Sequence, residues 1–495
     1  MAVACGEDFT VVVMEKGDLW TFGKDEYVQC ETNAVGLNGH GTDAYQLLPA
    51  CVGSPDDVFD GEAVVMVAAG HHHTACVTAK GKLWTWGNGE FGQLGHGDRE
   101  SRQRPERLEK EMYGGSPAVM VACGGSHTLV LTAGGLVWSC GDGDLGQLGH
   151  GDTSHMLVLT LVAEEVFRGE QIVMVAAGGK HSVALGAEGR VWTWGHGQSG
   201  RLGHNDEVNR LVPTQLAGEA LGGAAAVLVA AGCVHTAAVT SQGALWVWGR
   251  GSDGQLGLGD CARRLAPTLV GAETVFGQFQ VLTVACGHWH TLAVTKDGAL
   301  WTFGEGDDGK LGHNDFNDWL VPTRIEAQQF GNANIVAVAA GSRHSAAVTE
   351  DGTLYTWGNA PGLGHADGKT KLVPTHIAPH LLQGSRVGRC HDLPLLHALA
   401  FAMGTHARLG SAAPTAPVAG GDSKRWSQRQ QGKMPTSADE GKDCEFFTMP
   451  GELLHRVVES CESSWPEGRV GELDGVVRLV GGGMMKKRGS ASRSR

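Results

Sequence analysis

Histidine is the residue type whose spacing in this sequence first suggests chemistry, because an imidazole can act as an acid, a base or a metal ligand near neutral pH. The histidines recur in two fixed slots. In the first slot, three residues after a recurrent glycine, lie His73, His127, His181, His235, His290 and His344, with Phe9 in the first copy. In the second slot, inside a Leu-Gly-His turn, lie His96, His150, His204, His313 and His365. An active site is needed once, so this repetition predicts structural hydrogen bonds to loop backbone.

The run His71-His72-His73 is the cluster that most resembles a metal site. Successive side chains of a strand point to opposite faces, so three neighbours do not converge on one ion. The sequence also holds no Cys-x-x-Cys pair for a zinc ribbon and no His-Glu-x-x-His motif. We therefore expect no metal site and no catalytic residues.

Five glycine-rich stretches satisfy the dinucleotide-binding pattern Gly-x-Gly-x-x-Gly, beginning at Gly87, Gly141, Gly195, Gly249 and Gly304. That motif binds a pyrophosphate only where a helix begins directly after it. Here the motif is followed by text such as Gln-Leu-Gly-His-Gly-Asp, which cannot start a helix. We therefore expect turns that use a positive φ, and no cofactor.

The elements that position these residues belong to one repeated unit, which is clearest at residues 67–98. This unit predicts two short strands, a tight turn at Lys80-Gly81 and an aromatic strand around Trp84 and Trp86. A marker glycine ends its first strand and recurs at intervals of 64, 54, 54, 54, 55 and 54 residues. The marker glycines are Gly6, Gly70, Gly124, Gly178, Gly232, Gly287 and Gly341. Seven copies of one unit predict a repeat architecture.

Each copy also carries an aromatic residue 14 positions after its marker glycine, and most carry a proline at position 35. The aromatic residues are Trp20, Trp84, Trp138, Trp192, Trp246, Trp301 and Tyr355, which we expect in the core. The prolines are Pro105, Pro213, Pro267 and Pro322, with Leu159 in the third copy and with Pro49 and Pro374 at shifted positions. Proline cannot donate to a ladder, so it predicts an outer edge strand. Seven such sheets arranged radially make an all-β propeller.

The recurring text VAAGxxHTxxVTxxGxLWTWGxGxxGQLGHGD resembles the regulator of chromosome condensation repeat over roughly residues 1 to 385. The resemblance implies a seven-bladed β-propeller. The period of 54 residues also differs from the ~40–45 residues of WD-type repeats and the ~50 of kelch repeats. The family includes exchange factors for a small GTPase and a plant ultraviolet-B photoreceptor.

Composition changes after the last repeat predict further segments. The expected organisation of the chain is a seven-repeat propeller at 1–385, followed by a partial eighth repeat or closing segment at 386–410, a flexible linker at 411–442, a short helical segment at 443–483 and a basic disordered tail at 484–495. The helical segment either docks on its own propeller or binds a partner. The first copy carries an insertion between Gly23 and Gly36, which is either a surface loop or a partner-binding loop.

Charge and cysteine content limit the functional classes. The formal net charge of −14 argues against nucleic-acid binding by the propeller. Several of the 12 cysteines replace alanine in the first strand of a repeat, which suits the reducing cytoplasm or nucleus. No apolar run approaches the length of a membrane span, so we expect neither a secretory signal nor a membrane anchor.

The two residues between each marker glycine and its histidine vary from copy to copy. The small inner strands crowd the axis of a propeller, so the loops that leave them should converge on one face around the central channel. We predict a partner-binding face there, formed by His71, His72, Lys180, His288, Trp289 and Arg343. Trp289, with Arg343 stacked beside it, is the expected anchor.

Three functions compete. The lack of a convergent catalytic set favours a non-enzymatic protein-interaction scaffold. The family resemblance implies guanine-nucleotide exchange on a small GTPase, without covalent chemistry. The third and fourth copies are regular in length, however, so no insertion between them could form an exchange wedge. The resemblance also implies a photoreceptor function, and in photoreceptors of this family tryptophans occupy a Gly-Trp-Arg-His motif. We disfavour that function, because the slot after the marker glycine holds Glu7, His71, Gly125, Gly179, Cys233, His288 and Ser342.

Overall fold

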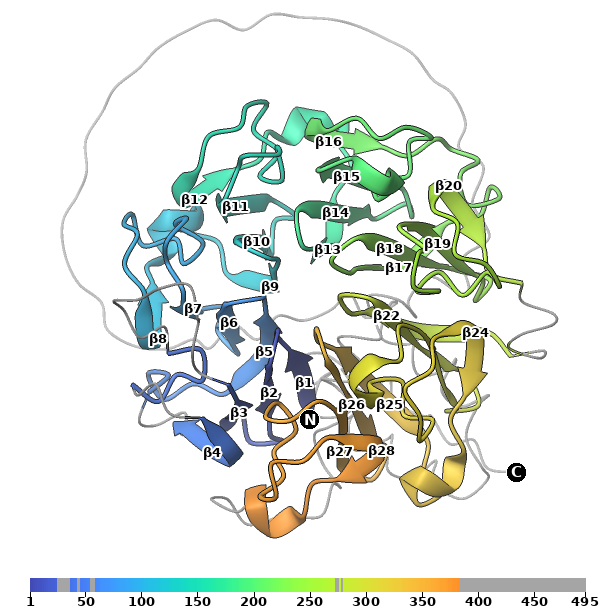
Figure 1. Cartoon of the computed structure of the whole chain (residues 1–495). Helices are drawn as coiled ribbons and strands as arrows, with labels where there is room; N and C mark the ends of the chain where they lie inside the picture. The colour runs from blue at the N-terminus through green and yellow to red at the C-terminus, as the bar shows by residue number, and fades with distance from the viewer. Residues whose placement is uncertain (25–35, 42–44, 54–57, 272–275, 277–278, 383–495) are drawn as a thin grey trace, which may run out of the picture. The chain divides into compact units, whose positions relative to one another are not determined.

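The computed structural model describes residues 1–382 except for 25–35, 42–44, 54–57, 272–275 and 277–278. These residues form seven antiparallel sheets of four strands, each built from strands consecutive in the chain. The sheets lie radially around a central channel (Figure 1). The predicted seven-bladed all-β propeller is therefore confirmed.

The segments predicted at 386–410, 411–442, 443–483 and 484–495 lie outside the described residues, as does most of the insertion in the first copy. Within the described part of the chain, no helix has the length and apolar character needed to cross a membrane.

Strands follow one another outward from the axis in every blade. The innermost are β1 (Ala2–Cys5), β5 (Val64–Ala69), β9 (Ala118–Cys123), β13 (Ile172–Ala177), β17 (Ala226–Ala231), β21 (Val281–Cys286) and β25 (Ile335–Ala340). The second strands are β2 (Phe9–Val13), β6 (His73–Thr78), β10 (His127–Thr132), β14 (His181–Gly186), β18 (His235–Thr240), β22 (His290–Thr295) and β26 (His344–Thr349). Marker glycines and their loops connect these two strands.

The outer half of each blade holds the aromatic strand and the edge strand. The aromatic strands are β3 (Leu19–Gly23), β7 (Leu83–Gly87), β11 (Val137–Gly141), β15 (Val191–Gly195), β19 (Leu245–Gly249), β23 (Leu300–Gly304) and β27 (Leu354–Gly358). The edge strands are β4 (Gln46–Gly53), β8 (Arg102–Leu108), β12 (Met156–Leu161), β16 (Arg210–Gln215), β20 (Arg264–Leu269), β24 (Trp319–Arg324) and β28 (Lys371–His376). The repeat prolines lie in these edge strands, as predicted.

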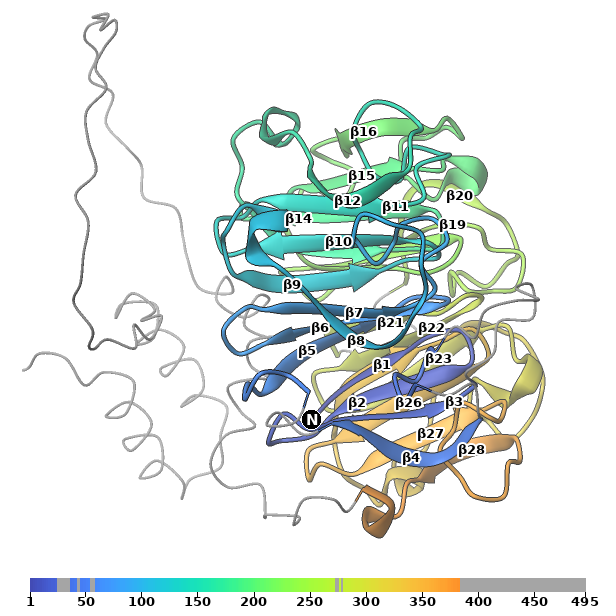
Figure 2. The same ribbon diagram turned by 90° about the vertical axis from the view of Figure 1, so that its left-hand side faces the viewer.

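Short 3-10 helices complete the described chain. They are η1 (Lys110–Tyr113), η2 (Glu164–Phe167), η3 (Gln198–Gly200), η4 (Asp307–Gly309), η5 (Ala327–Phe330) and η6 (Pro379–Leu382). The strands run between the two faces of the propeller, so the loops gather on those faces (Figure 2).

Small residues allow the inner strands to meet at the axis. Cysteine or alanine ends each inner strand and lines the channel, and a marker glycine follows. A Cβ atom built on Gly124 would lie 2.5 Å from the carbonyl oxygen of Gly178 in the next blade. Six of the seven marker glycines make this close approach to the next blade, and at Gly6 the added Cβ would meet the ring of Phe9 instead.

Aromatic side chains fill the space between blades, as predicted. Trp84 is 7% exposed and Trp192 is fully buried, whereas Trp246 is partly exposed. The aromatic residues two positions later are buried more uniformly. Trp86, Trp194, Trp248 and Trp357 are among the largest fully buried side chains.

The ring closes between the first and last blades without sharing a strand. Strand β1 packs against β25 and β26. The Nε2 atom of His344 lies 2.8 Å from the hydroxyl of Thr10, and the amide of Ser342 donates to the carbonyl of Gly6 at 3.3 Å. The same kinds of contact join the second to seventh blades to one another, so closure repeats the interblade pattern.

Candidate interaction face around the central channel

The first-slot histidines form a ring of hydrogen bonds that joins the blades. Each Nε2 atom lies 2.8 to 3.0 Å from a threonine or serine hydroxyl of the next blade. The pairs are His73 with Thr128, His127 with Ser182, His181 with Thr236, His235 with Thr291, His290 with Ser345 and His344 with Thr10. Each hydroxyl donates its own proton to a backbone carbonyl, so each imidazole is the donor in its pair.

Burial keeps these imidazoles neutral. It lowers the pKa of His73, His127 and His235 to about 3, and that of His344 to about 4. A neutral ring with its N–H engaged between two blades is a structural donor rather than a proton shuttle. The structural role predicted for this slot is confirmed, but the partner of each Nε2 atom is a side-chain hydroxyl of the next blade and not the loop backbone that we expected.

Phe9 breaks the pattern in the first blade. Its ring is fully buried. Because phenylalanine has no ring nitrogen, Thr74 in the second blade has no histidine facing it in this slot. The Thr74 hydroxyl donates to the carbonyl of Leu37 at 3.4 Å, and the indole N–H of Trp86 donates to the same oxygen at 3.0 Å. The first interblade boundary therefore relies on packing, on this shared carbonyl and on backbone bonds such as that from the Gly41 amide to the Gln103 carbonyl at 3.0 Å.

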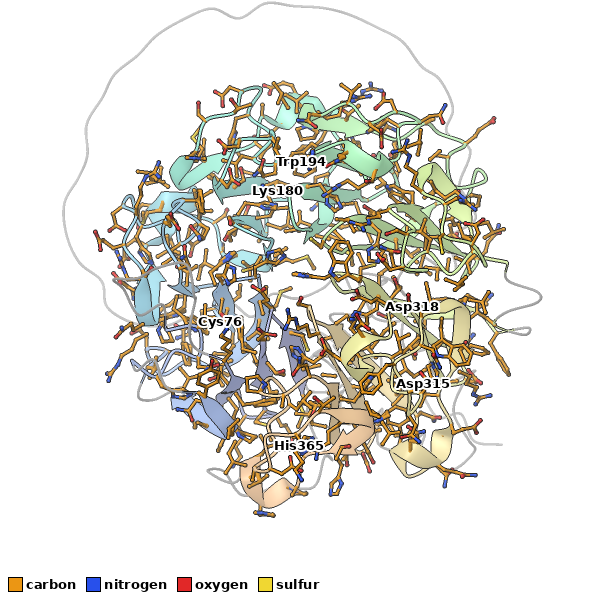
Figure 3. All side chains as sticks on the ribbon, in the orientation of Figure 1. Cys76, Lys180, Trp194, Asp315, Asp318 and His365 are labelled. Carbon is orange, nitrogen blue, oxygen red and sulfur yellow. The ribbon has the colours of Figure 1, made fainter. Side chains whose placement is uncertain are left out.

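The second-slot histidines act within one blade. Their Nε2 atoms lie 2.8 to 3.1 Å from a threonine or serine of the aromatic strand, pairing His96 with Thr85, His150 with Ser139, His204 with Thr193, His313 with Thr302 and His365 with Thr356. Figure 3 labels His365 in the last blade. His40 makes the same bond to Thr21 at 2.9 Å, although its turn reads Leu-Asn-Gly-His and the sequence pattern missed it.

The glycine-rich loops reach the same face as the inner loops. The amide of Asn88 donates to the carbonyl of His72 at 2.7 Å, and the amide of His196 donates to the carbonyl of Lys180 at 2.9 Å. Gly92 has a φ of 83°, and its amide donates to the carbonyl of Gly89 at 2.7 Å, which confirms a turn that favours glycine. In the described residues these loops contain short 3-10 turns such as η3 and η4, and no α-helix follows them.

The six residues predicted for a partner-binding face all lie in the loops between first and second strands. Lys180, labelled in Figure 3, and Arg343 are exposed, whereas His71, His72, His288 and Trp289 are half-buried. His71 and His288 meet across the channel, with their Nε2 atoms 2.7 Å apart. His72 lies 3.1 Å from the carboxylate of Glu7. Blades distant in sequence therefore contribute to one surface.

The cation over Trp289 differs from the one predicted. The guanidinium of Arg250 lies 4.6 Å from the centroid of the Trp289 ring, where we expected Arg343. Arg250 belongs to the glycine-rich loop of the preceding blade, which reaches over to the neighbouring inner loop. Arg343 instead lies close to Glu7 and Asp8, where its charge opposes the rise in pKa that burial imposes on both carboxyls.

Sequence reasoning missed the basic residues beneath this face. Arg201 is 5% exposed, and its guanidinium donates to the carbonyl of Cys233 at 3.1 Å. Lys310 is 1% exposed and lies 2.5 Å from the carboxylate of Glu305. Both residues replace the glutamine found at this repeat position in other copies. That departure from the repeat was the signal that could have identified them.

Two relatives are similar in sequence to large parts of this chain. It is 41% identical over 296 residues to the ultraviolet-B receptor UVR8 of Arabidopsis thaliana, covering 60% of this chain and 65% of the receptor. It is 37% identical over 327 residues to the E3 ubiquitin-protein ligase HERC2 of Homo sapiens, covering 66% of this chain but 7% of the ligase. The chain thus spans less than two thirds of each of these relatives.

Solved structures share the fold. Human WBSCR16 superposes with a TM-score of 0.61 at 27% identity, covering 71% of this chain and 87% of that one. Prp20p of Saccharomyces cerevisiae gives a TM-score of 0.62 at 24% identity, covering 76% and 87%.

Family models match most of the propeller. The model described as the RCC1-like domain matches residues 1–277. Two models of the regulator of chromosome condensation (RCC1) repeat match residues 281–310 and 297–348. The chain therefore belongs to the RCC1-like domain family of seven-bladed propellers.

Proposed function

We propose that this protein is a non-enzymatic interaction scaffold that binds a protein partner on the face around its central channel. The observation that carries the proposal is the pair Trp289 and Arg250, a half-buried indole under a guanidinium at 4.6 Å on a loop that varies between copies. Tryptophan and arginine anchors of this kind carry a large share of interface energy.

The chemistry around this pair suits a partner of mixed charge. Exposed Lys180 and Arg343 lie among inner loops that also carry Glu7 and Asp8. A face with both signs of charge selects partners by electrostatic complementarity and raises their association rate. The repeated histidines are already committed to structural hydrogen bonds, so they support binding rather than proton transfer.

The compartment we propose is the cytoplasm or the nucleus. Cys76, Cys123 and Cys140 are buried free thiols, which suit a reducing environment.

Affinity capture with the full-length chain tests the proposal. The variant Trp289→Ala/Arg250→Ala should lose most of the partners that the parent retains, because truncating such anchors costs about 2 kcal/mol or more each. The matched control is Trp319→Ala/Arg324→Ala, which removes the same residue types from the edge strand β24. Equal loss in both variants, or in neither, would contradict the proposed face.

A second assay separates the scaffold from an exchange factor. Prp20p, described by its binding to Gsp1p and histones, shares this fold at 24% identity. Any small GTPase that the full-length chain captures should be loaded with a fluorescent guanine nucleotide and assayed for release. Binding without faster release supports a scaffold, whereas accelerated release supports guanine-nucleotide exchange.

A further inference from the structure

The residues that directly follow the marker glycines form a ring at one level of the channel. They are Glu7, His71, Gly125, Gly179, Cys233, His288 and Ser342. Backbone bonds between blades hold this ring narrow. The amides of His71, Cys233 and His288 each donate to a marker-glycine carbonyl of the next blade at 3.2 Å. Equivalent positions in different blades are therefore close enough to act together.

Three members of this ring gather into one cluster. The imidazole nitrogens of His71 and His288 and the sulfur of Cys233 lie within 4.8 Å of one another. The two Nε2 atoms are 2.7 Å apart, and the ring centroids are separated by 4.3 Å. The three side chains come from the second, fifth and sixth blades and all are half-buried.

We propose that His71, Cys233 and His288 bind a zinc ion at the mouth of the central channel. Two imidazoles and one thiolate form a nitrogen and sulfur donor set. Such a set binds zinc, a borderline-soft ion, in preference to hard cations, which favour oxygen ligands. In a tetrahedral site with Zn–N bonds of about 2.05 Å, the two nitrogens stand about 3.3 Å apart. The observed pair needs to open only slightly to admit the ion. This site departs from our expectation of no metal, which considered adjacent histidines and short local motifs but not residues that separate blades bring together.

The surroundings of the cluster provide space and orientation. A Cβ atom on Gly179 would lie 2.9 Å from the Cys233 sulfur, so glycine keeps that position open. The Nδ1 atom of His288 lies 2.8 Å from the hydroxyl of Ser342. With Nε2 on the ion, Nδ1–H donates to this hydroxyl, which is the usual second contact of a metal-binding histidine. The Arg201 guanidinium donates a hydrogen bond to the carbonyl oxygen of Cys233, which fixes the backbone of the cysteine.

Zinc titration of the purified full-length chain, stripped with a chelator, tests the site. We expect one tightly bound zinc per chain, and a sulfur-to-metal charge-transfer band when cobalt replaces it. Cys233→Ser and His71→Gly should each weaken zinc binding by at least about 100-fold, because even second contacts contribute about 10- to 100-fold. Ser342→Ala should weaken it by about tenfold. Serine and glycine already occupy this ring position in other blades, so the variants introduce residues that the loop accepts.

Control variants decide where any bound zinc sits. His155→Gln removes the other described group that could hold a metal, Asp142, Asp144 and His155, and Cys261→Ser removes an exposed thiol. Both should bind zinc like the parent. Retention of full affinity in Cys233→Ser, or its loss in His155→Gln, would overturn the proposal.

A labelling experiment on the unaltered protein gives an independent readout. Zinc should slow the alkylation of Cys233 by iodoacetamide, measured by peptide mass spectrometry, while the exposed Cys261 reacts at an unchanged rate. Equal labelling of Cys233 with and without zinc would overturn the assignment even if a variant failed to fold.

Discussion

The buried interblade histidines predict that this propeller unfolds in mild acid. Six first-slot rings have pKa values lowered mainly by burial: His73, His127, His181, His235, His290 and His344. A histidine whose pKa is lowered in the folded state contributes its full stability at pH values above its unfolded pKa, which is near 6.5. That stability is lost as the pH falls below 6.5 toward the folded pKa, because the unfolded chain binds the proton first.

The magnitude follows from the values for individual rings. For a folded pKa of about 3, as at His73, His127 and His235, lowering the pH from 7 to 5 costs about 2 kcal/mol per ring. His344, whose folded pKa is about 4, loses a similar amount, so these four rings together lose about 8 kcal/mol, which is comparable with the whole stability of a typical domain, about 5–15 kcal/mol. His181 and His290, whose pKa values burial lowers well below 6.5, add to this loss. Burial also lowers the pKa of second-slot rings such as His150 and His204, which adds to the loss in the same direction.

Urea unfolding followed by tryptophan fluorescence between pH 5 and pH 8 measures this loss. His235→Phe should reduce the pH dependence by one proton, or about 1.4 kcal/mol per pH unit, well below pH 6.5. Phenylalanine is a suitable replacement because Phe9 occupies this slot in the first blade. His376→Phe, at an exposed position of the outer strand β28, is the matched control and should leave the slope unchanged. Equal stability at pH 5 and pH 7 would refute the reasoning, since it would mean that the folded rings protonate freely.

Two further predictions concern packing. Trp84→Ala should lower the free energy of unfolding by about 3–5 kcal/mol, and Trp246→Ala by less, because Trp84 is 7% exposed whereas Trp246 is partly exposed. Denaturant titration compares them, and equal losses would show that burial does not control the effect. Gly124→Ala should destabilise by about 1–3 kcal/mol or prevent folding, because the new Cβ would lie 2.5 Å from the Gly178 oxygen. Gly218→Ala, with no atom within 4 Å of its Cβ, is the control, and similar melting temperatures for the two variants would contradict the close approach.

The repeat made the fold predictable from the sequence. Marker glycines at nearly constant intervals, small inner strands and prolines on the edge strands each have one physical explanation, and all of them agree on a propeller. The structural role of the first-slot histidines was also predictable, because a repeated residue is explained by a repeated contact. Their partners were not, since the sequence does not show that each ring reaches a hydroxyl in the next blade, as His127 does with Ser182.

Only the tertiary structure decided which residues on the face meet. The repeat register places His71, Cys233 and His288 at equivalent positions, but their approach depends on the channel width, which marker glycines and interblade backbone bonds determine. The pairing of Trp289 with Arg250 depends on how far the preceding glycine-rich loop extends. Periodicity in a sequence specifies contacts that recur in every blade. Contacts made once, across the axis or between unequal loops, depend on the geometry of ring closure.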